Sequence, residues 1–159
     1  MKVFQKVVNR CADVICVLLV IILMCISPMI IGYQPMIVLS GSMEPTYHVG
    51  SLIYVKQTPF DKLEVGDVIT YGKSRSQLVS HRIVEISQLS QTVVTKGDAN
   101  QVSDKEIQSH LIRGKIGAIS IPYMGYIFQI VRKPIVLGMC LALFVVKIYL
   151  DENNGRIRI

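Results

Sequence analysis

The sequence predicts a mainly β domain with an apolar helix at each end, and three observations support this fold class. First, a chain of 159 residues has room for a single domain. Second, 51% of the residues are hydrophobic, which excludes a disordered tail, a coiled coil and a small disulfide scaffold. Third, the apolar residues form uncharged runs at 14–31 and 134–146, and between these runs they recur with period 2.

The first apolar run predicts a transmembrane anchor. Its 18 residues, at about 1.5 Å each, cover most of a hydrocarbon core that is about 30 Å thick. The competing interpretation is a cleaved signal peptide, which has a shorter apolar core and a small-residue cleavage site. Lys2, Lys6 and Arg10 precede the run, and such bases predict a cytoplasmic amino terminus. We therefore expect a cytoplasmic N-terminus and a membrane anchor in residues 1–36.

The segment between the runs predicts short β-strands. Its β-branched stretches alternate apolar and polar residues, and Gly, Asn, Asp, Pro or Ser bounds each of them. The stretches are residues 51–56, 67–71, 78–86, 92–95 and 111–121. Residues 119–131 include Tyr123 and Tyr126 and are too short to span a bilayer, which suits an interfacial surface. We expect an extracytoplasmic β-rich domain in residues 37–131 that lies against the membrane.

The second apolar run predicts a second transmembrane helix. This helix must tolerate Lys147, whose aliphatic stem could reach toward the interface. Arg132 and Lys133 would then lie outside, against the usual distribution of bases. If this run did not span the membrane, it would form an apolar helix that little of the remaining domain could cover. We expect the second transmembrane helix and a cytoplasmic tail in residues 132–159.

Charge and cysteine usage limit the partners. Between residues 41 and 131 there are nine basic and eight acidic residues, so the basic excess belongs to the ends of the chain. A nucleic-acid interface would need those bases clustered on the folded domain, and we predict no nucleic-acid partner. The cysteines lie in or beside the apolar runs, and the spacing of the three histidines matches no zinc motif. We predict no metal and no cofactor.

Three sparse motifs between the runs suggest nucleophilic catalysis. They are SGSMEP at residues 40–45, SHR at residues 80–82 and KGDANQVSD at residues 96–104. A serine hydroxyl needs a base to take its proton, and that base needs a third group to hold its tautomer and stabilise its cation. Ser42, His81 and a carboxylate of the third motif supply one of each. Their chain order is no obstacle, because such sites recur in several orders.

Taken together, SGSMEPT, GDVITY, SHRIV and KGDAN, in this order, resemble type I signal peptidases. The resemblance is to the branch typical of the endoplasmic reticulum, archaea and some Gram-positive bacteria, in which a histidine replaces the lysine base of the main bacterial branch. It implies Ser42 as the nucleophile and His81 as the general base. It also implies that the hydroxyl of Ser40 helps the backbone N–H of Ser42 to hold the oxyanion, while Met43 shapes the turn where substrate binds.

The resemblance implicates two carboxylates, and the sequence ranks them. Asp104 is the better candidate for orienting His81. Asp98 follows Gly97 in a tight turn and is expected to brace the loop. Lys73 and Lys96 are the alternative bases, but His81 lies in the matching motif and needs no large pKa shift to work near neutral pH.

The resemblance implies a membrane-bound serine endopeptidase that cleaves signal peptides from exported precursors. Its substrates would lie extended along a strand edge, with small residues at the first and third positions before the cut. The expected location is the cell membrane, with the endoplasmic reticulum membrane as the alternative. The sequence does not indicate whether accessory subunits are required. Two rival functions are a self-cleaving peptidase of the repressor type and a non-catalytic membrane assembly protein. The first predicts a DNA-binding helix-turn-helix and no anchor, the reverse of this chain.

Overall fold

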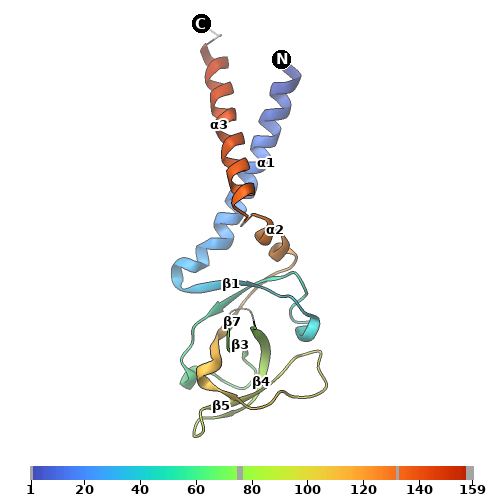
Figure 1. The fold of residues 1–159 in the computed structure, drawn as a ribbon, viewed down its shortest axis with the longest axis vertical. Coiled ribbons are helices and arrows are strands. Elements are labelled where there is room, and N and C mark those ends of the chain that lie inside the picture. The colour runs from blue at the N-terminus through green and yellow to red at the C-terminus, as the bar shows by residue number, and fades with distance from the viewer. Residues whose placement is uncertain (1, 75–76, 132, 157–159) are drawn as a thin grey trace. The chain divides into compact units, whose positions relative to one another are not determined.

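The computed structural model describes residues 2–74, 77–131 and 133–156, and they divide into two compact units. One unit consists of the two ends of the chain, residues 1–26 and 127–159, and the other is Ser27–Tyr126 (Figure 1). Arg132 and residues 157–159, which the second predicted span and tail include, lie outside the described residues.

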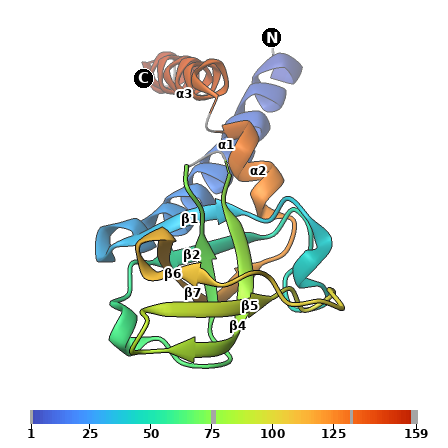
Figure 2. The same ribbon diagram turned by 60° about the horizontal axis from the view of Figure 1, so that its bottom comes forward.

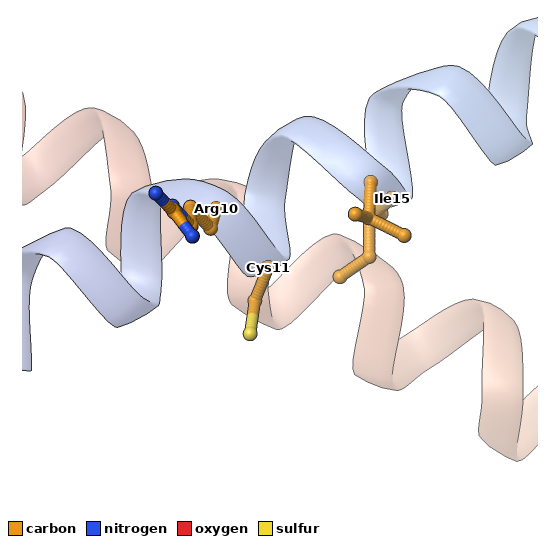
Figure 3. Close-up of a pocket in the computed structure, with 4 residues that line it drawn as sticks. Arg10, Cys11 and Ile15 are labelled. Carbon is orange, nitrogen blue, oxygen red and sulfur yellow. The ribbon is translucent and has the colours of Figure 1, made fainter.

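The first unit contains two long helices, α1 (Lys2–Ile26) and α3 (Pro134–Arg156), which contact each other. The Nζ atom of Lys147 lies 2.7 Å from Oδ1 of Asp13 on α1. The positive charge within the second apolar run is therefore paired with a carboxylate. Figure 3 shows a pocket on α1, which Arg10, Cys11, Val14 and Ile15 line. None of the predicted site residues lines this pocket.

The two predicted membrane spans coincide with α1 and α3. Over the part of the chain that the structure describes, no helix combines the length and the apolar character that crossing a bilayer requires. The two spans therefore stay predictions.

The second unit is built on one antiparallel sheet of seven strands, which confirms the mainly β fold class. The strand order is β1-β2-β7-β3-β4-β5-β6. The strands are β1 (Tyr33–Ile37), β2 (Leu52–Lys56), β3 (Val68–Tyr71), β4 (Val79–Ser87), β5 (Thr92–Lys96), β6 (Ile107–Gln108) and β7 (Ile112–Ile121). Figure 2 shows β4 and β5 side by side. Short 3-10 helices, η1 (Ser27–Ile31), η2 (Gly41–Met43), η3 (Phe60–Lys62) and η4 (Ser109–Leu111), connect these elements.

The five strands expected from the alternation are β2, β3, β4, β5 and β7, each within one residue of its predicted ends. The alternation missed β1 because Pro35 interrupts it, and a proline inside a strand is tolerated at a sheet edge, where β1 lies. It missed β6 because two residues show no period. The interfacial segment at residues 119–131 contains the end of β7 and the helix α2 (Met124–Val131), which was not predicted.

The sheet has a hydrophobic cluster on each face. Neighbouring residues of β3 show this division, since Val68 belongs to one cluster and Ile69 to the other. The first cluster is Met43, Ile53, Val55, Val68 and Ile116, and the second is Leu63, Ile69, Ile83, Val93 and Ile107. His81 is paired with Ile69 across β3 and β4, and it therefore lies on the face of the second cluster.

We expect Ile83→Ala to destabilise the β unit, because Ile83 is 1% exposed and its loss leaves a cavity in the second cluster. Such truncations cost about 2–5 kcal/mol of unfolding free energy. Denaturant unfolding of the full chain in detergent measures the effect. Leu89→Ala is the control, since Leu89 is 99% exposed, and equal stability of both variants would contradict the assignment of Ile83 to the core.

Candidate active site

The imidazole of His81 is held from one side by Asp104. His81 comes from β4 and is 6% exposed. Its Nδ1 atom lies 2.6 Å from Oδ2 of Asp104. Asp104 lies in the loop after β5, and its own N–H donates to the carbonyl of Thr95 over 2.8 Å. A carboxylate on Nδ1 favours the tautomer whose Nε2 is free to accept a proton, which is the arrangement a general base requires.

The same carboxylate oxygen receives two further hydrogen bonds. The hydroxyl of Thr95 donates to Oδ2 of Asp104 over 2.6 Å, and the hydroxyl of Tyr71 donates to it over 3.1 Å. Burial alone would raise the pKa of Asp104, but the hydrogen bonds from Thr95, His81 and Tyr71 outweigh it and hold that pKa below its usual value. Asp104 is therefore a carboxylate at neutral pH and can stabilise a cation on His81.

Ser42 lies in the short helix η2, at a turn that both packing and main-chain contacts hold. The next residue, Met43, is 2% exposed and belongs to the first hydrophobic cluster. The carbonyl of Ser42 accepts a hydrogen bond of 2.9 Å from the N–H of Ala99. The hydroxyl of Ser40 lies 3.4 Å from that of Ser42, and η2 contacts β4, the strand of His81. The nucleophile and base candidates thus lie on contacting elements.

Gly97 allows the Ser42 turn and the loop after β5 to approach each other. A Cβ atom on Gly97 would lie 2.6 Å from the carbonyl oxygen of Ser42 and 2.8 Å from Nδ2 of Asn100. No carbon atom tolerates a main-chain oxygen at that distance, so any larger residue would displace the turn.

Asp98 contacts a different partner from Asp104. Both oxygens of its carboxylate accept hydrogen bonds from one edge of the Arg82 guanidinium, with 2.9 Å from Nε to Oδ1 and 2.6 Å from Nη2 to Oδ2. Thr46 donates to Oδ2 of Asp98, and Nη1 of Arg82 donates to the carbonyl of Gly66. The Arg82 hydrogen bonds hold the pKa of Asp98 below its usual value, and the same contact raises that of Arg82. This cluster takes one residue from each of the stretches SGSMEPT, GDVITY, SHRIV and KGDAN, and it connects them as a brace would.

The other histidines lie apart from this arrangement. His48 is exposed, and its Nδ1 lies 2.5 Å from Oε2 of Glu44, a pairing that the sequence did not reveal. His110 is also exposed. Among the residues with a described structure, no three His, Cys, Asp or Glu side chains group as a metal ion would need.

Sequence reasoning assigned no role to Thr95, Tyr71 or Arg82. Strand alternation could have grouped Tyr71 with His81, because the register pairs Ile69 with His81 and residues two apart share a face. No pattern in the sequence indicates that the loop after β5 returns Asp104 to Thr95. The catalytic roles of Ser42, His81, Asp104, Asp98, Ser40 and Met43 stay predictions.

Comparison with known proteins finds a matching family model and several similar proteins. The family model described as "Signal peptidase, peptidase S26" matches residues 11–116, which include every candidate site residue. Signal peptidase I W of Bacillus subtilis (strain 168) is 38% identical over 100 residues, which are 60% of this chain and 53% of that protein.

Two further relatives are subunits of a complex. The signal peptidase complex catalytic subunit SEC11 of Colletotrichum graminicola is 34% identical over 102 residues, 57% of this chain and 59% of that protein. Subunit SEC11C of Homo sapiens is 29% identical over 102 residues, 57% of this chain and 53% of that protein. The chain therefore spans about half the length of the relatives that it matches.

If the chain cleaves peptide bonds at Ser42, we expect Gly97→Ala to lower that activity more than stability. The added methyl group would meet the Ser42 carbonyl and break its hydrogen bond from Ala99, which displaces Ser42, the candidate nucleophile, while the core stays packed. A displacement of about 1 Å is expected to lower the rate by about 100-fold. The rate is measured on a precursor substrate beside the thermal unfolding midpoint. Gly138→Ala is the control, because a Cβ there meets no atom within 4 Å and its φ lies outside the left-handed region. A fully active Gly97→Ala variant would rule out the steric argument.

We expect Asp98→Asn to lower stability in a pH-dependent way. The pKa of Asp98 is lower in the folded chain than its usual value of 3.8, so its ionised form stabilises the fold above that pH. The contribution disappears as the pH falls through the folded value. Losing a charged hydrogen-bond partner costs about 1.5–3 kcal/mol. Unfolding midpoints of the wild type and Asp98→Asn should therefore differ at pH 6 to 7 and converge below about pH 3.8. Asp61→Asn, at an exposed site, is the control, and its unfolding midpoint should match that of the wild type at both pH values.

Proposed function

Because the chain belongs to the signal peptidase family S26, we propose that it is a serine endopeptidase that cleaves signal peptides from exported precursor proteins. The observation that supports this proposal best is the contact of 2.6 Å between the buried imidazole of His81 and the Asp104 carboxylate. That pair lies in the matched region, next to the element that holds Ser42.

In the proposed reaction, Ser42 Oγ attacks the scissile carbonyl carbon while Nε2 of His81 takes the hydroxyl proton. The carbonyl oxygen becomes an oxyanion. The backbone N–H of Ser42 and the hydroxyl of Ser40 donate to it, and the Ser40 hydroxyl already lies 3.4 Å from the attacking oxygen. Asp104 stabilises the imidazolium that forms, which is why a low pKa for this carboxyl suits the role.

The second half of the reaction returns the enzyme to its starting state. The imidazolium gives its proton to the leaving amine, which departs as the new amino terminus of the mature protein, and the signal peptide stays esterified to Ser42. Water then attacks this ester as His81 takes one of its protons. Collapse of the second oxyanion releases the carboxylate of the signal peptide, and His81 returns the proton to Ser42.

The location and partners form part of the proposal. Residues 1–36 and 132–159 would attach the chain to a membrane, with residues 37–131 as the catalytic domain on the extracytoplasmic face of the cell membrane. The support is the charge distribution around the two apolar runs. An endoplasmic reticulum membrane is the alternative. Accessory subunits would be a further class of partner, since two of the relatives are named as subunits of a complex.

A non-catalytic assembly role is less well supported. Such a role would not require Asp104 to be held as an anion on the Nδ1 atom of a buried histidine. Burying ionisable groups is costly, and it is common where chemistry uses them.

We expect Ser42→Ala and His81→Ala each to abolish cleavage and leave the fold intact, because each removes a group that the chemical step requires. The double variant should be little worse than either single variant, since residues that act as a unit are not additive. Precursors incubated with the full chain in detergent are analysed by mass spectrometry for new amino termini.

The matched controls are Ser90→Ala and His110→Ala, which change the same residue types at exposed positions. Both should cleave as the wild type does. Substantial cleavage by Ser42→Ala would contradict the proposed function.

A further inference from the structure

Three side chains converge on one oxygen atom of Asp104. Oδ2 lies 2.6 Å from Nδ1 of His81, 2.6 Å from Oγ1 of Thr95 and 3.1 Å from the hydroxyl of Tyr71. We infer that Thr95 and Tyr71 are positioning residues, whose hydroxyls hold Asp104 in place so that it can orient His81. This inference rests on the proposed function, because positioning matters only if His81 is the base.

The strand register explains how three separate residues reach one oxygen. Ile69 of β3 is paired with His81 of β4, and Ile83 of β4 is paired with Thr95 of β5. Residues two apart along a strand share a face, so Tyr71, His81 and Thr95 all lie on the face of the second cluster. The rings of Tyr71 and His81 meet edge to face at 6.4 Å. Three neighbouring strands therefore supply one donor each.

The protonation states decide the direction of these hydrogen bonds. Burial raises the pKa of Tyr71 to about 12, so its hydroxyl keeps its proton at every pH at which the chain would work. An ionised carboxylate only accepts. Thr95 is 0% exposed and has one hydroxyl proton, and the carboxylate at 2.6 Å is a stronger acceptor than the Tyr71 oxygen at 3.3 Å. Both hydroxyls therefore donate to Asp104.

Fixing Oδ2 from three sides has a specific consequence for His81. A carboxylate with one partner can rotate about its own axis and move Oδ2 away from Nδ1. The donors from β3 and β5 oppose that rotation, and the N–H of Asp104 on the Thr95 carbonyl fixes the backbone as well. Neither hydroxyl needs to touch substrate. Their effect on catalysis should pass entirely through Asp104.

The first arm of the test measures turnover. We expect Tyr71→Phe and Thr95→Val each to lower kcat about 10- to 100-fold, the factor of one charged hydrogen bond, with KM unchanged. Thr95→Ser keeps the hydroxyl and should restore most of kcat. Thr70→Val is the matched control, because Thr70 is also 0% exposed and its hydroxyl contacts Ser80 at 2.9 Å instead of Asp104. Wild-type kcat in Tyr71→Phe and in Thr95→Val would overturn the inference.

The second arm places the same substitutions in an Asp104→Asn background. Asp104→Asn alone should lower kcat by about 10⁴, as loss of the orienting carboxylate does in the serine-protease case. If Thr95 and Tyr71 act through Asp104, Tyr71→Phe and Thr95→Val should then cause little further loss. A full additional 10- to 100-fold loss in this background would show that they act by another route, and it would overturn the inference.

The third arm does not depend on proteolysis. The carboxyl carbon of Asp104 is titrated by NMR in the full chain, and the pKa should rise in Tyr71→Phe and Thr95→Val but not in Thr70→Val. An unmoved titration would overturn the inference whether or not the chain cleaves precursors. If the wild type does not cleave and the titration still shifts, the proposed function fails while the hydrogen bonds to Asp104 stand.

Discussion

The antiparallel pairing of β4 between β3 and β5 is the constraint on which the site depends. Successive side chains of a strand point to opposite faces, so the consecutive residues His81 and Arg82 cannot share a partner. His81 takes Asp104 above the second cluster, and Arg82 takes Asp98 on the other face. The division of labour between the two carboxylates follows from the pleat of this one strand.

Burial makes both carboxylates depend on their donors. Each is largely removed from water, with 27% of the Asp104 side chain and 16% of the Asp98 side chain exposed. The cost of burying the Asp98 charge is offset by the Arg82 guanidinium, a cation with fixed geometry, which suits a role in holding segments together. Asp104 is compensated mainly by neutral hydroxyls and by an imidazole. A neutral environment of this kind keeps the anion available for a positive charge that appears only during the reaction.

The sequence predicts the local features of this structure better than the long-range ones. Five strands follow from short β-branched stretches bounded by turn residues, and β1 does not fit this pattern because Pro35 interrupts it at an edge of the sheet. The motifs named Ser42, His81 and both aspartates as candidates because each occurs in a short, distinctive stretch. Thr95 and Tyr71 were not named, since a threonine and a tyrosine in strands are usually packing residues. Only the return of the loop after β5 brings an anion to their hydroxyls.

The contacts of the two aspartates fix the length of the segment between them. Asp98 is fastened to Arg82 and Asp104 to His81, and these anchor points are adjacent on one strand. An insertion or deletion in residues 99–103 would therefore detach one carboxylate from its partner, whatever the inserted residues are. The hairpin between β4 and β5 has no such tie at its exposed tip, Leu89. Related sequences should accordingly vary in length at that hairpin and keep a constant length between the two aspartates.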